Sequence, residues 1–244
     1  MKYCITLACC FIALAMYALD ADEILLRADN RRAVASSFRF TLSITDYKDG
    51  MECDRAKMSG NAKGVDKTMV QYEEPVNMRG KKLLMVNDEM YVFVPKTRRP
   101  VRLTASQRLM GQASNGDVMN VRYSSDYTPR LTGEEKIQIE NESVQCLVLE
   151  LNAKRKGCTY NRMVLWVDKN GCFPVKANCY ALSGKLVKTV FYSGRKHMGG
   201  HHIVTKASLY DRVQENSHTV IEFLEMVEEE ISENLFNKEF LLRM

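Results

Sequence analysis

The sequence predicts a mainly β protein with a few short helices, folded as one domain around a large curved antiparallel sheet or barrel. Three observations lead to this prediction. Apolar and polar residues alternate over many short segments, turn dipeptides separate these segments, and no linker rich in Pro, Gly or Ser divides the 244 residues. The roughly even spacing of these segments predicts about 10–11 strands.

The composition is that of an ordinary globular protein, with 45% hydrophobic and 27% charged residues. The formal net charge of +5 is small and dispersed along the chain. It does not indicate nucleic acid, so we expect no nucleic-acid partner. After the first twenty residues, no apolar run is long enough to span a bilayer.

The N-terminus predicts a secretory signal peptide over residues 1–21. Lys2 supplies a positive charge, and an apolar stretch without charges follows from Tyr3 to Leu19. Ala18 or Ala21 could precede the cleavage site, and an uncleaved membrane anchor is the alternative. Residues 22–244 are then the mature domain, which works outside the cytoplasm.

The cysteines of the mature domain fit an exported protein only in part. Five remain after the predicted signal peptide: Cys53, Cys146, Cys158, Cys172 and Cys179. An odd number leaves at least one thiol unpaired, and no pair has the CxxC spacing of a zinc site. One or two disulfides are compatible with an oxidising compartment.

The elements begin with a short helix and then change to a period of two. The helix starts near Asp22 as N-cap and buries Ile24, Leu25 and Ala28. The next segment is a strand with four apolar residues on one face: Phe38, Phe40, Leu42 and Ile44. Further strands are predicted at 51–63, 65–73, 81–86 and 90–94.

The middle of the chain is different, because residues 105–127 have poor periodicity and many Gly, Ser and Asn residues. We expect one or two short helices there, in a long excursion from the sheet. Strands resume at 136–140, 144–153, 162–167, 173–180, 185–192, 203–210 and 219–227. The tail carries Ile231, Leu235, Phe236, Phe240 and Leu241, which could cover an open end as a short helix.

A curved sheet of this size needs helices or a ligand over its concave face. Several strands carry methionine, whose flexible side chain adapts to variable apolar shapes. We therefore predict a cavity for acyl chains, although ordinary core packing is the alternative for each methionine. The candidate lining residues are Leu42, Ile44, Met69, Met85, Met90, Val92, Val94, Met110, Met119 and Met163.

Two segments resemble the periplasmic outer-membrane lipoprotein-sorting proteins, the LolA-like group. Tyr91-Val-Phe-Val-Pro-Lys-Thr-Arg-Arg-Pro-Val-Arg-Leu103 is similar to the family's Y-x-Pro-x-x-Arg-Arg-x-x-Arg-Ile segment. The block from Trp166 to Tyr180, followed by Gly184-Lys-Leu, is similar to its W-hydrophobic-Asp block. The tail is similar to the C-terminal signature of the family, whereas Val121-Arg-Tyr-Ser-Ser-Asp-Tyr127 departs from its aromatic-rich middle run.

The resemblance implies an incomplete antiparallel β-barrel closed by a helical lid, with an apolar interior that holds acyl chains. It implies a periplasmic carrier that moves lipoproteins or lipids towards the outer membrane. The implied partners are an acylated lipoprotein or a phospholipid, together with inner- and outer-membrane transfer proteins. No cofactor is expected.

A basic turn follows the strand that ends at Val94. It contains Lys96, Arg98, Arg99 and Arg102. Arginine pairs bidentately with phosphate, so this turn is a candidate rim for lipid headgroups or an anionic membrane surface. The alternative is a solvated sheet edge whose cations discourage aggregation.

Three of the four histidines cluster in His197-Met-Gly-Gly-His-His202. His197, His201 and His202 are weak metal candidates, because adjacent histidines point to opposite faces of a strand and no HExxH motif is present. Histidine is also a general base, so a lipid acyl hydrolase is an alternative function. A non-catalytic membrane-associated scaffold is the second alternative.

Overall fold

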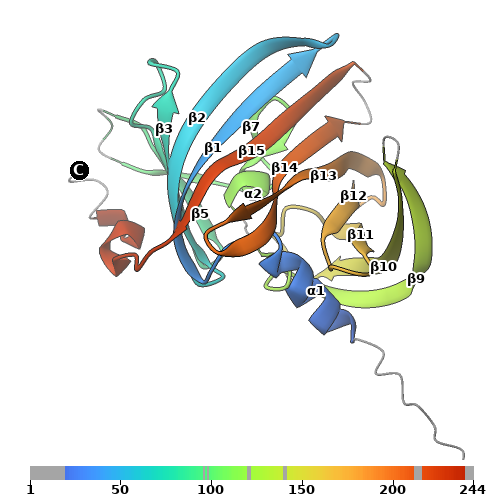
Figure 1. Cartoon of the computed structure of the whole chain (residues 1–244). Coiled ribbons are helices and arrows are strands. Elements are labelled where there is room, and N and C mark those ends of the chain that lie inside the picture. The colour runs from blue at the N-terminus through green and yellow to red at the C-terminus, as the bar shows by residue number, and fades with distance from the viewer. Residues whose placement is uncertain are drawn as a thin grey trace, which may run out of the picture.

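One antiparallel sheet of 13 strands forms the frame of the molecule. The computed structural model describes residues 20–95, 97, 99–119, 122–139, 142–211 and 216–239. Within them the strand order is β6-β5-β4-β3-β2-β1-β15-β14-β13-β12-β11-β10-β9, and the sheet curves without closing (Figure 1). The predicted fold class is confirmed, although the described sheet has more strands than the 10–11 expected. Its two edges, β6 and β9, do not pair with each other.

The chain builds the sheet as two meanders. The first runs outwards from the centre through β1 (Ser37–Lys48), β2 (Met51–Lys63), β3 (Lys67–Glu74), β4 (Lys82–Val86), β5 (Glu89–Phe93) and β6 (Val101–Leu103). The second returns from the far edge through β9 (Tyr127–Ile139), β10 (Glu142–Ala153), β11 (Arg162–Asp168), β12 (Pro174–Tyr180), β13 (Leu186–Met198), β14 (His201–Asp211) and β15 (Ser217–Glu228). β15 then pairs with β1 at the centre.

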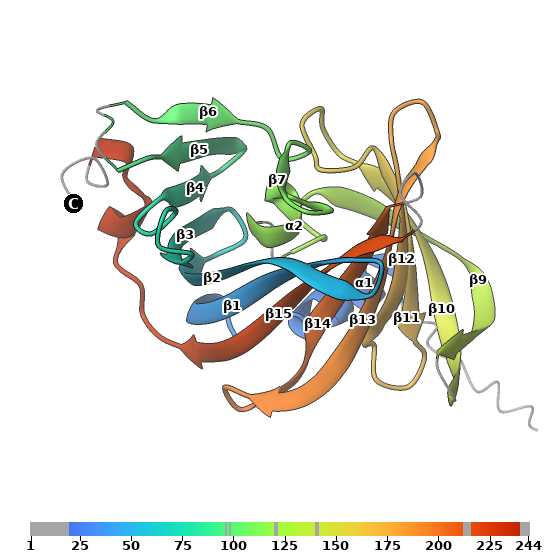
Figure 2. The ribbon, with the colours of Figure 1, turned by 90° about the horizontal axis from the view of Figure 1, so that it is seen from above.

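Residues 104–126 connect the two meanders, so they must pass from one edge of the sheet to the other. They contain β7 (Arg108–Met110), β8 (Ala113–Ser114) and α2 (Asn115–Met119), which lie inside the curve of the sheet (Figures 1 and 2). We call residues 104–126 the crossing segment. The predicted excursion with a short helix is therefore present, and it covers the concave face.

Hydrogen bonds attach the crossing segment at two points. In its middle, the backbone amide of Gln112 donates to Thr219 Oγ1 at 2.6 Å, and Thr219 Oγ1 donates to Asp46 Oδ1 at 2.7 Å. Near its end, the backbone amides of Tyr123 and Ser124 each donate to the buried carboxylate of Asp29 at 2.8 Å. Charge-assisted bonds of this kind are the strong ones, so the segment is firmly attached to the sheet and to α1.

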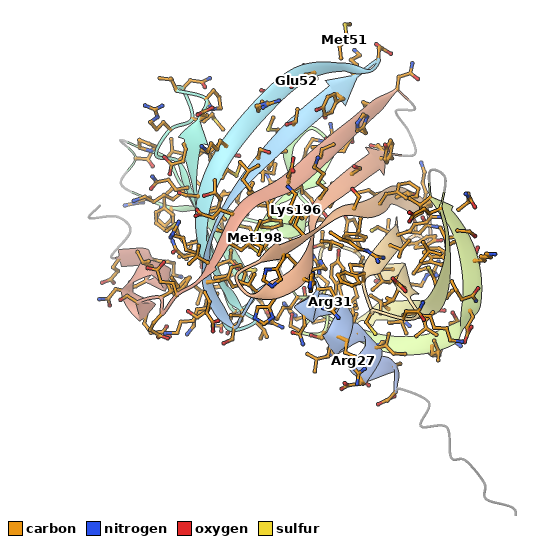
Figure 3. All side chains as sticks on the ribbon, in the orientation of Figure 1. Arg27, Arg31, Met51, Glu52, Lys196 and Met198 are labelled. Carbon is orange, nitrogen blue, oxygen red and sulfur yellow. The ribbon has the colours of Figure 1, made fainter. Side chains whose placement is uncertain are left out.

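Helix α1 (Ala21–Asn30) packs its apolar stripe of Ile24, Leu25 and Ala28 into the main core. The helix begins at Ala21, one residue before the predicted N-cap Asp22. Asp20 occupies the N-cap position, and its side chain makes no capping hydrogen bond. Figure 3 shows Arg27 on the outer part of α1 and Arg31 where the helix meets the strands. Arg31 donates from Nε to the carbonyl of Gly171 at 2.9 Å, which joins the helix to the turn before β12.

The core lies between the concave face of the sheet, α1 and the crossing segment. All four predicted residues of β1, Phe38, Phe40, Leu42 and Ile44, are at most 1% exposed. Gly60 on β2 allows this packing, because a Cβ atom there would lie 2.3 Å from the Phe40 ring. The alternation of β1 is therefore confirmed as a buried face.

The C-terminal tail packs on the opposite, outer face of the sheet. A short 3-10 helix, η1 (Glu233–Phe236), follows β15. Ile231 and Phe236 are buried there in a cluster with three residues of the first meander: Met69, Leu84 and Phe93. The tail therefore covers an outer surface of β3–β5 and not an open end, while Phe240 and Leu241 lie outside the described residues.

Residues 1–19 also lie outside the described residues, so the predicted signal peptide stays a prediction. No helix within the described part of the chain is long and apolar enough to cross a membrane.

Candidate functional site

Most of the predicted apolar lining residues belong to the packed core. Leu42, Ile44 and Met163 are fully buried, Met119 is 1% exposed, and all four contact other core residues. Met85, Met90 and Val92 are also buried in this core, and Met110 packs against it. Leu42, Ile44, Met119 and Met163 are thus packed among other core side chains, whereas Met85 and Met90 also line a smaller cavity.

Two of the predicted lining residues lie elsewhere. Met69 is on the outer face under η1, because strand alternation places Val70 and Tyr72, and not Met69, towards the core. Val94 follows the end of β5 and is 42% exposed. Neither residue therefore belongs to the core cluster of the concave face.

An open cleft of about 700 Å³ lies at one end of the sheet. Three segments form most of its walls: residues 106–114 of the crossing segment, the β10–β11 connection at 153–161, and the β12–β13 turn with the start of β13 at 181–188. Asp211 at the end of β14 also lines the cleft. Figure 2 shows these connections gathered beside β7. The volume falls within the range of about 300–1,000 Å³ that is common for ligand sites.

The wall of the cleft combines apolar and polar groups. Its apolar side chains are Ala113, Ala153, Cys158, Tyr160, Ala181, Leu182 and Val187. Leu182 stands in the β12–β13 turn and is 86% exposed. An exposed apolar side chain on the wall of a cleft is available to contact an apolar ligand.

A buried ionic network forms the floor of the cleft. The Lys188 ammonium donates to Asp117 Oδ2 and to Tyr160 Oη, both at 2.6 Å, and Tyr160 Oη donates to Asp117 Oδ1 at 2.7 Å. Ser114 completes the network, since its amide and hydroxyl donate to Asp117 Oδ2 at 2.8 and 2.7 Å. The network joins the crossing segment, which carries Ser114 and Asp117, to the sheet at β13.

The charges of this network are fixed by its geometry. Burial acts to raise the pKa of Asp117, but the Lys188 ammonium and the Ser114 hydrogen bonds outweigh it, so the pKa lies below its usual value. Burial and the Asp117 charge together raise the pKa of Tyr160 well above its usual value. Asp117 therefore stays ionised at neutral pH, and Tyr160 stays a protonated donor.

Gly116 brings α2 against the β10–β11 connection, because any Cβ atom at this position would overlap the Thr159 side chain. A second cavity of about 180 Å³ lies beyond this contact, and it is lined by Met85 and Met90. It shares Arg155, Gly157 and Thr159 with the large cleft. Two of the predicted methionines therefore lie next to the cleft, behind a shared wall.

The predicted basic turn is only partly described. Arg99 and Arg102 are exposed, and Arg102 lies 3.4 Å from Glu89, while Lys96 and Arg98 lie outside the described residues. The exposure of Arg99 and Arg102 is compatible with both interpretations of the basic turn, a rim that binds lipid headgroups and a solvated sheet edge. None of these residues is described along the wall of the large cleft.

The three clustered histidines lie on an exposed hairpin formed by β13 and β14. His197 pairs with His202 across the two strands, and their rings are 5.0 Å apart between centroids. Figure 3 shows neighbouring Lys196 and Met198 on the same stretch of β13. No group of three or more His, Cys, Asp or Glu residues suited to a metal occurs within the described residues.

Cys53, Cys146, Cys158, Cys172 and Cys179 are all described, and all are free thiols. The one or two disulfides that an oxidising compartment would allow are not formed among them. Cys146 lies on the outer face of the sheet with Trp166, whereas Cys172 and Cys179 belong to the main core. Burial raises the pKa of Cys146 to about 11, so this thiol is protonated at neutral pH.

Comparison with solved structures decides the family. The chain is 31% identical to a LolA superfamily protein of Nitrosomonas europaea, with a TM-score of 0.82 over 91% of this chain and 100% of that one. The chain belongs to the LolA superfamily. A family model described only as an uncharacterized protein also matches residues 64–243.

The LolA-like fold recurs at lower identity. A DUF1329 family protein of Desulfovibrio piger is 22% identical with a TM-score of 0.76, over 91% of this chain and 97% of that one. A putative outer membrane lipoprotein-sorting protein domain of Vibrio parahaemolyticus is 20% identical with a TM-score of 0.75, over 92% of this chain and 100% of that one. No curated protein matches the sequence.

The sequence did not identify the cleft, because its walls come from three connections that are far apart along the chain. One signal was available: Leu182 is an apolar residue beside the Ser183-Gly184 turn, where solvation favours polar residues. Lys188 and Asp117 carry no local motif that would distinguish them from surface charges.

Proposed function

We propose that the protein is a carrier for acylated lipoproteins or lipids in the bacterial periplasm, and that the large cleft receives an acyl chain. The cleft of about 700 Å³ at the end of an unclosed sheet carries the proposal. Membership of the LolA superfamily and the predicted signal peptide support it. The process would be driven by burial of acyl CH₂ groups, each contributing about 0.8 kcal/mol.

The crossing segment would act as the lid in this carrier. The large cleft and the smaller cavity that Met85 and Met90 line share a wall of Arg155, Gly157 and Thr159, and Gly116 of α2 packs against Thr159 in this wall. Displacement of α2 together with this wall would join the two spaces and give a longer acyl chain access to the concave face. The Asp117–Lys188 pair would then hold the lid in the closed position.

Inner- and outer-membrane transfer proteins are the partners that this function requires. The exposed Arg99 and Arg102 stay candidates for contact with an anionic membrane surface. Replacing Arg99 and Arg102 with Gln should then weaken binding to vesicles that contain anionic phospholipid. Unchanged binding would remove this part of the proposal.

Mass spectrometry of organic extracts from the mature protein, expressed with its signal peptide, tests the carrier function. A carrier yields stoichiometric phospholipid or acylated protein that survives unchanged. A clean extract supports the scaffold alternative, and lysolipid with free fatty acid supports the hydrolase. For the hydrolase, products should disappear when His197, His201 and His202 are replaced with Ala; the residues described along the cleft include no histidine.

A further inference from the structure

The cations around the cleft fall into two groups. Two of them are neutralised by carboxylates: Lys188 pairs with Asp117 at 2.6 Å, and Arg155 pairs with Asp126 at 2.6 Å and also with Asp88. These pairs hold the crossing segment and the β10–β11 connection in place. Their charges are already compensated, so they supply structure and little free positive potential.

Two other cations that line the cleft are less fully compensated. Lys156 is exposed in the β10–β11 connection and has no ion pair with the described residues. Arg108 on β7 is exposed and forms only a long ion pair of 4.0 Å with Asp211, which also lines the cleft. They come from two different segments of the cleft wall, the crossing segment and the β10–β11 connection. An anion entering the cleft would meet both, and arginine binds phosphate oxygens in a bidentate manner.

Apolar groups share the same wall. Leu182 and Val187 line the cleft together with Lys156 and Arg108. A ligand that satisfies both kinds of surface is an amphiphile with an apolar chain and an anionic head. A free inorganic anion would leave the apolar wall in contact with water.

We infer that the mouth of the cleft is a recognition site for the phosphate of an anionic lipid headgroup, held by Arg108 and Lys156 while the acyl chain lies along Leu182 and Val187. This inference rests on the proposed carrier function, and it names the class of lipid that the carrier selects. Exposed ion pairs weaken with salt, so the selectivity should fall as ionic strength rises.

Calorimetric titration of the delipidated mature protein tests the inference. The probes are a monoacylglycerol phosphate, the monoacylglycerol with the same chain, and inorganic phosphate. We expect the phosphate-bearing lipid to bind about tenfold more tightly than the neutral one, as hydrogen bonds to charged groups predict. The double variant R108Q/K156Q should bring this ratio close to one.

The control variant K57Q/K136Q removes the same charge from exposed lysines on β2 and β9, away from the cleft. It should keep the native ratio. The inference is overturned if the native protein shows no preference, if R108Q/K156Q keeps it, or if K57Q/K136Q loses it equally. Inorganic phosphate that binds as tightly as the lipid phosphate also overturns it, because the ligand is then a free anion.

If the proposed carrier function itself is wrong, the titrations give a different pattern of lipid binding from the one that overturns only the headgroup site. Neither lipid then binds to the native protein, at low or at high salt. If both lipids bind equally, the carrier function stands and only the headgroup site is lost. Circular dichroism of each variant checks that the fold is retained before the ratios are compared.

Discussion

The concave face and the cleft beside it are neighbouring regions that differ in how tightly their side chains are packed. On the concave face, Leu42, Ile44 and Met163 are fully buried among other apolar residues, α1 and the crossing segment. In the cleft, Leu182 stands open to solvent above an ionic network of Lys188, Asp117 and Tyr160. The first region is a core that stabilises the fold, and the second has the space that a ligand needs.

The difference shows that apolar character alone does not locate a lipid site. A side chain that lines an open cavity and one that fills a core have the same sequence pattern, because both lie on the inward face of a strand. What separates them here is the crossing segment, which packs against the core residues of the concave face and leaves the large cleft at its side. Substitutions should therefore affect stability in one region and binding in the other.

The largest expected effect on stability comes from the buried ionic network of Asp117, Lys188 and Tyr160. Replacing Asp117 with Asn leaves the Lys188 ammonium buried without its counter-ion, and the free energy of unfolding should fall by about 3–5 kcal/mol. Denaturant unfolding measures this change. The double variant D117N/K188M removes both charges and should regain much of the loss. Equal stability of D117N and the native protein would contradict a structural role of the pair.

The Asp117–Lys188 pair should also affect how the free energy of unfolding depends on pH. The folded pKa of Asp117 lies below its unfolded value of about 3.9, so its stabilisation is present above that pH and disappears as pH falls through the folded pKa. Unfolding free energies measured from pH 6 to pH 3 should fall more steeply for the native protein than for D117N. Parallel curves would show that Asp117 contributes nothing.

Met163 tests the packed region. Replacing it with Ala should lower the free energy of unfolding by about 2–5 kcal/mol, because the surrounding core cannot collapse onto the missing side chain. If Met163 instead lined a ligand cavity, the variant would keep most of its stability and change lipid binding. Thermal unfolding combined with lipid titration separates these results.

The smallest effect on stability is expected at Leu182. Because this residue is 86% exposed, its replacement with Ala should change the unfolding free energy by no more than about 0.5 kcal/mol. The affinity of this variant for an acyl ligand should still fall about fivefold, which corresponds to about 1 kcal/mol of binding free energy. Unchanged affinity in a calorimetric titration would remove Leu182 from the ligand site.

Much of the fold followed from local patterns. The alternation of β1, the hairpin after Asp168, and the irregular stretch that became the crossing segment were all visible in the sequence. The strand count was too low because short strands such as β6 and β7 carry too few residues to show a period. The odd number of cysteines predicted at least one unpaired thiol, but the sequence could not show that all five are free, because pairing depends on distances between strands.

The site was harder to predict than the fold. Met69 shows why: its strand is apolar on both faces, since η1 returns from the far end of the chain to cover the outer one. Alternation therefore could not assign Met69 to either side. Asp117 and Lys188 are 71 positions apart, and only the passage of the crossing segment over the sheet brings them together.

Photo-crosslinking with a phospholipid that carries a diazirine in its acyl chain tests the central claim most directly. Peptide mapping of the crosslinked native protein should place the label on the walls of the cleft, at Leu182, Val187 or Cys158. Label that reached Met85 or Met90 as well would fit displacement of the crossing segment. Label confined to Leu42, Ile44 and Met163 would contradict the account, because the lipid would then occupy the concave face that the structure shows as filled.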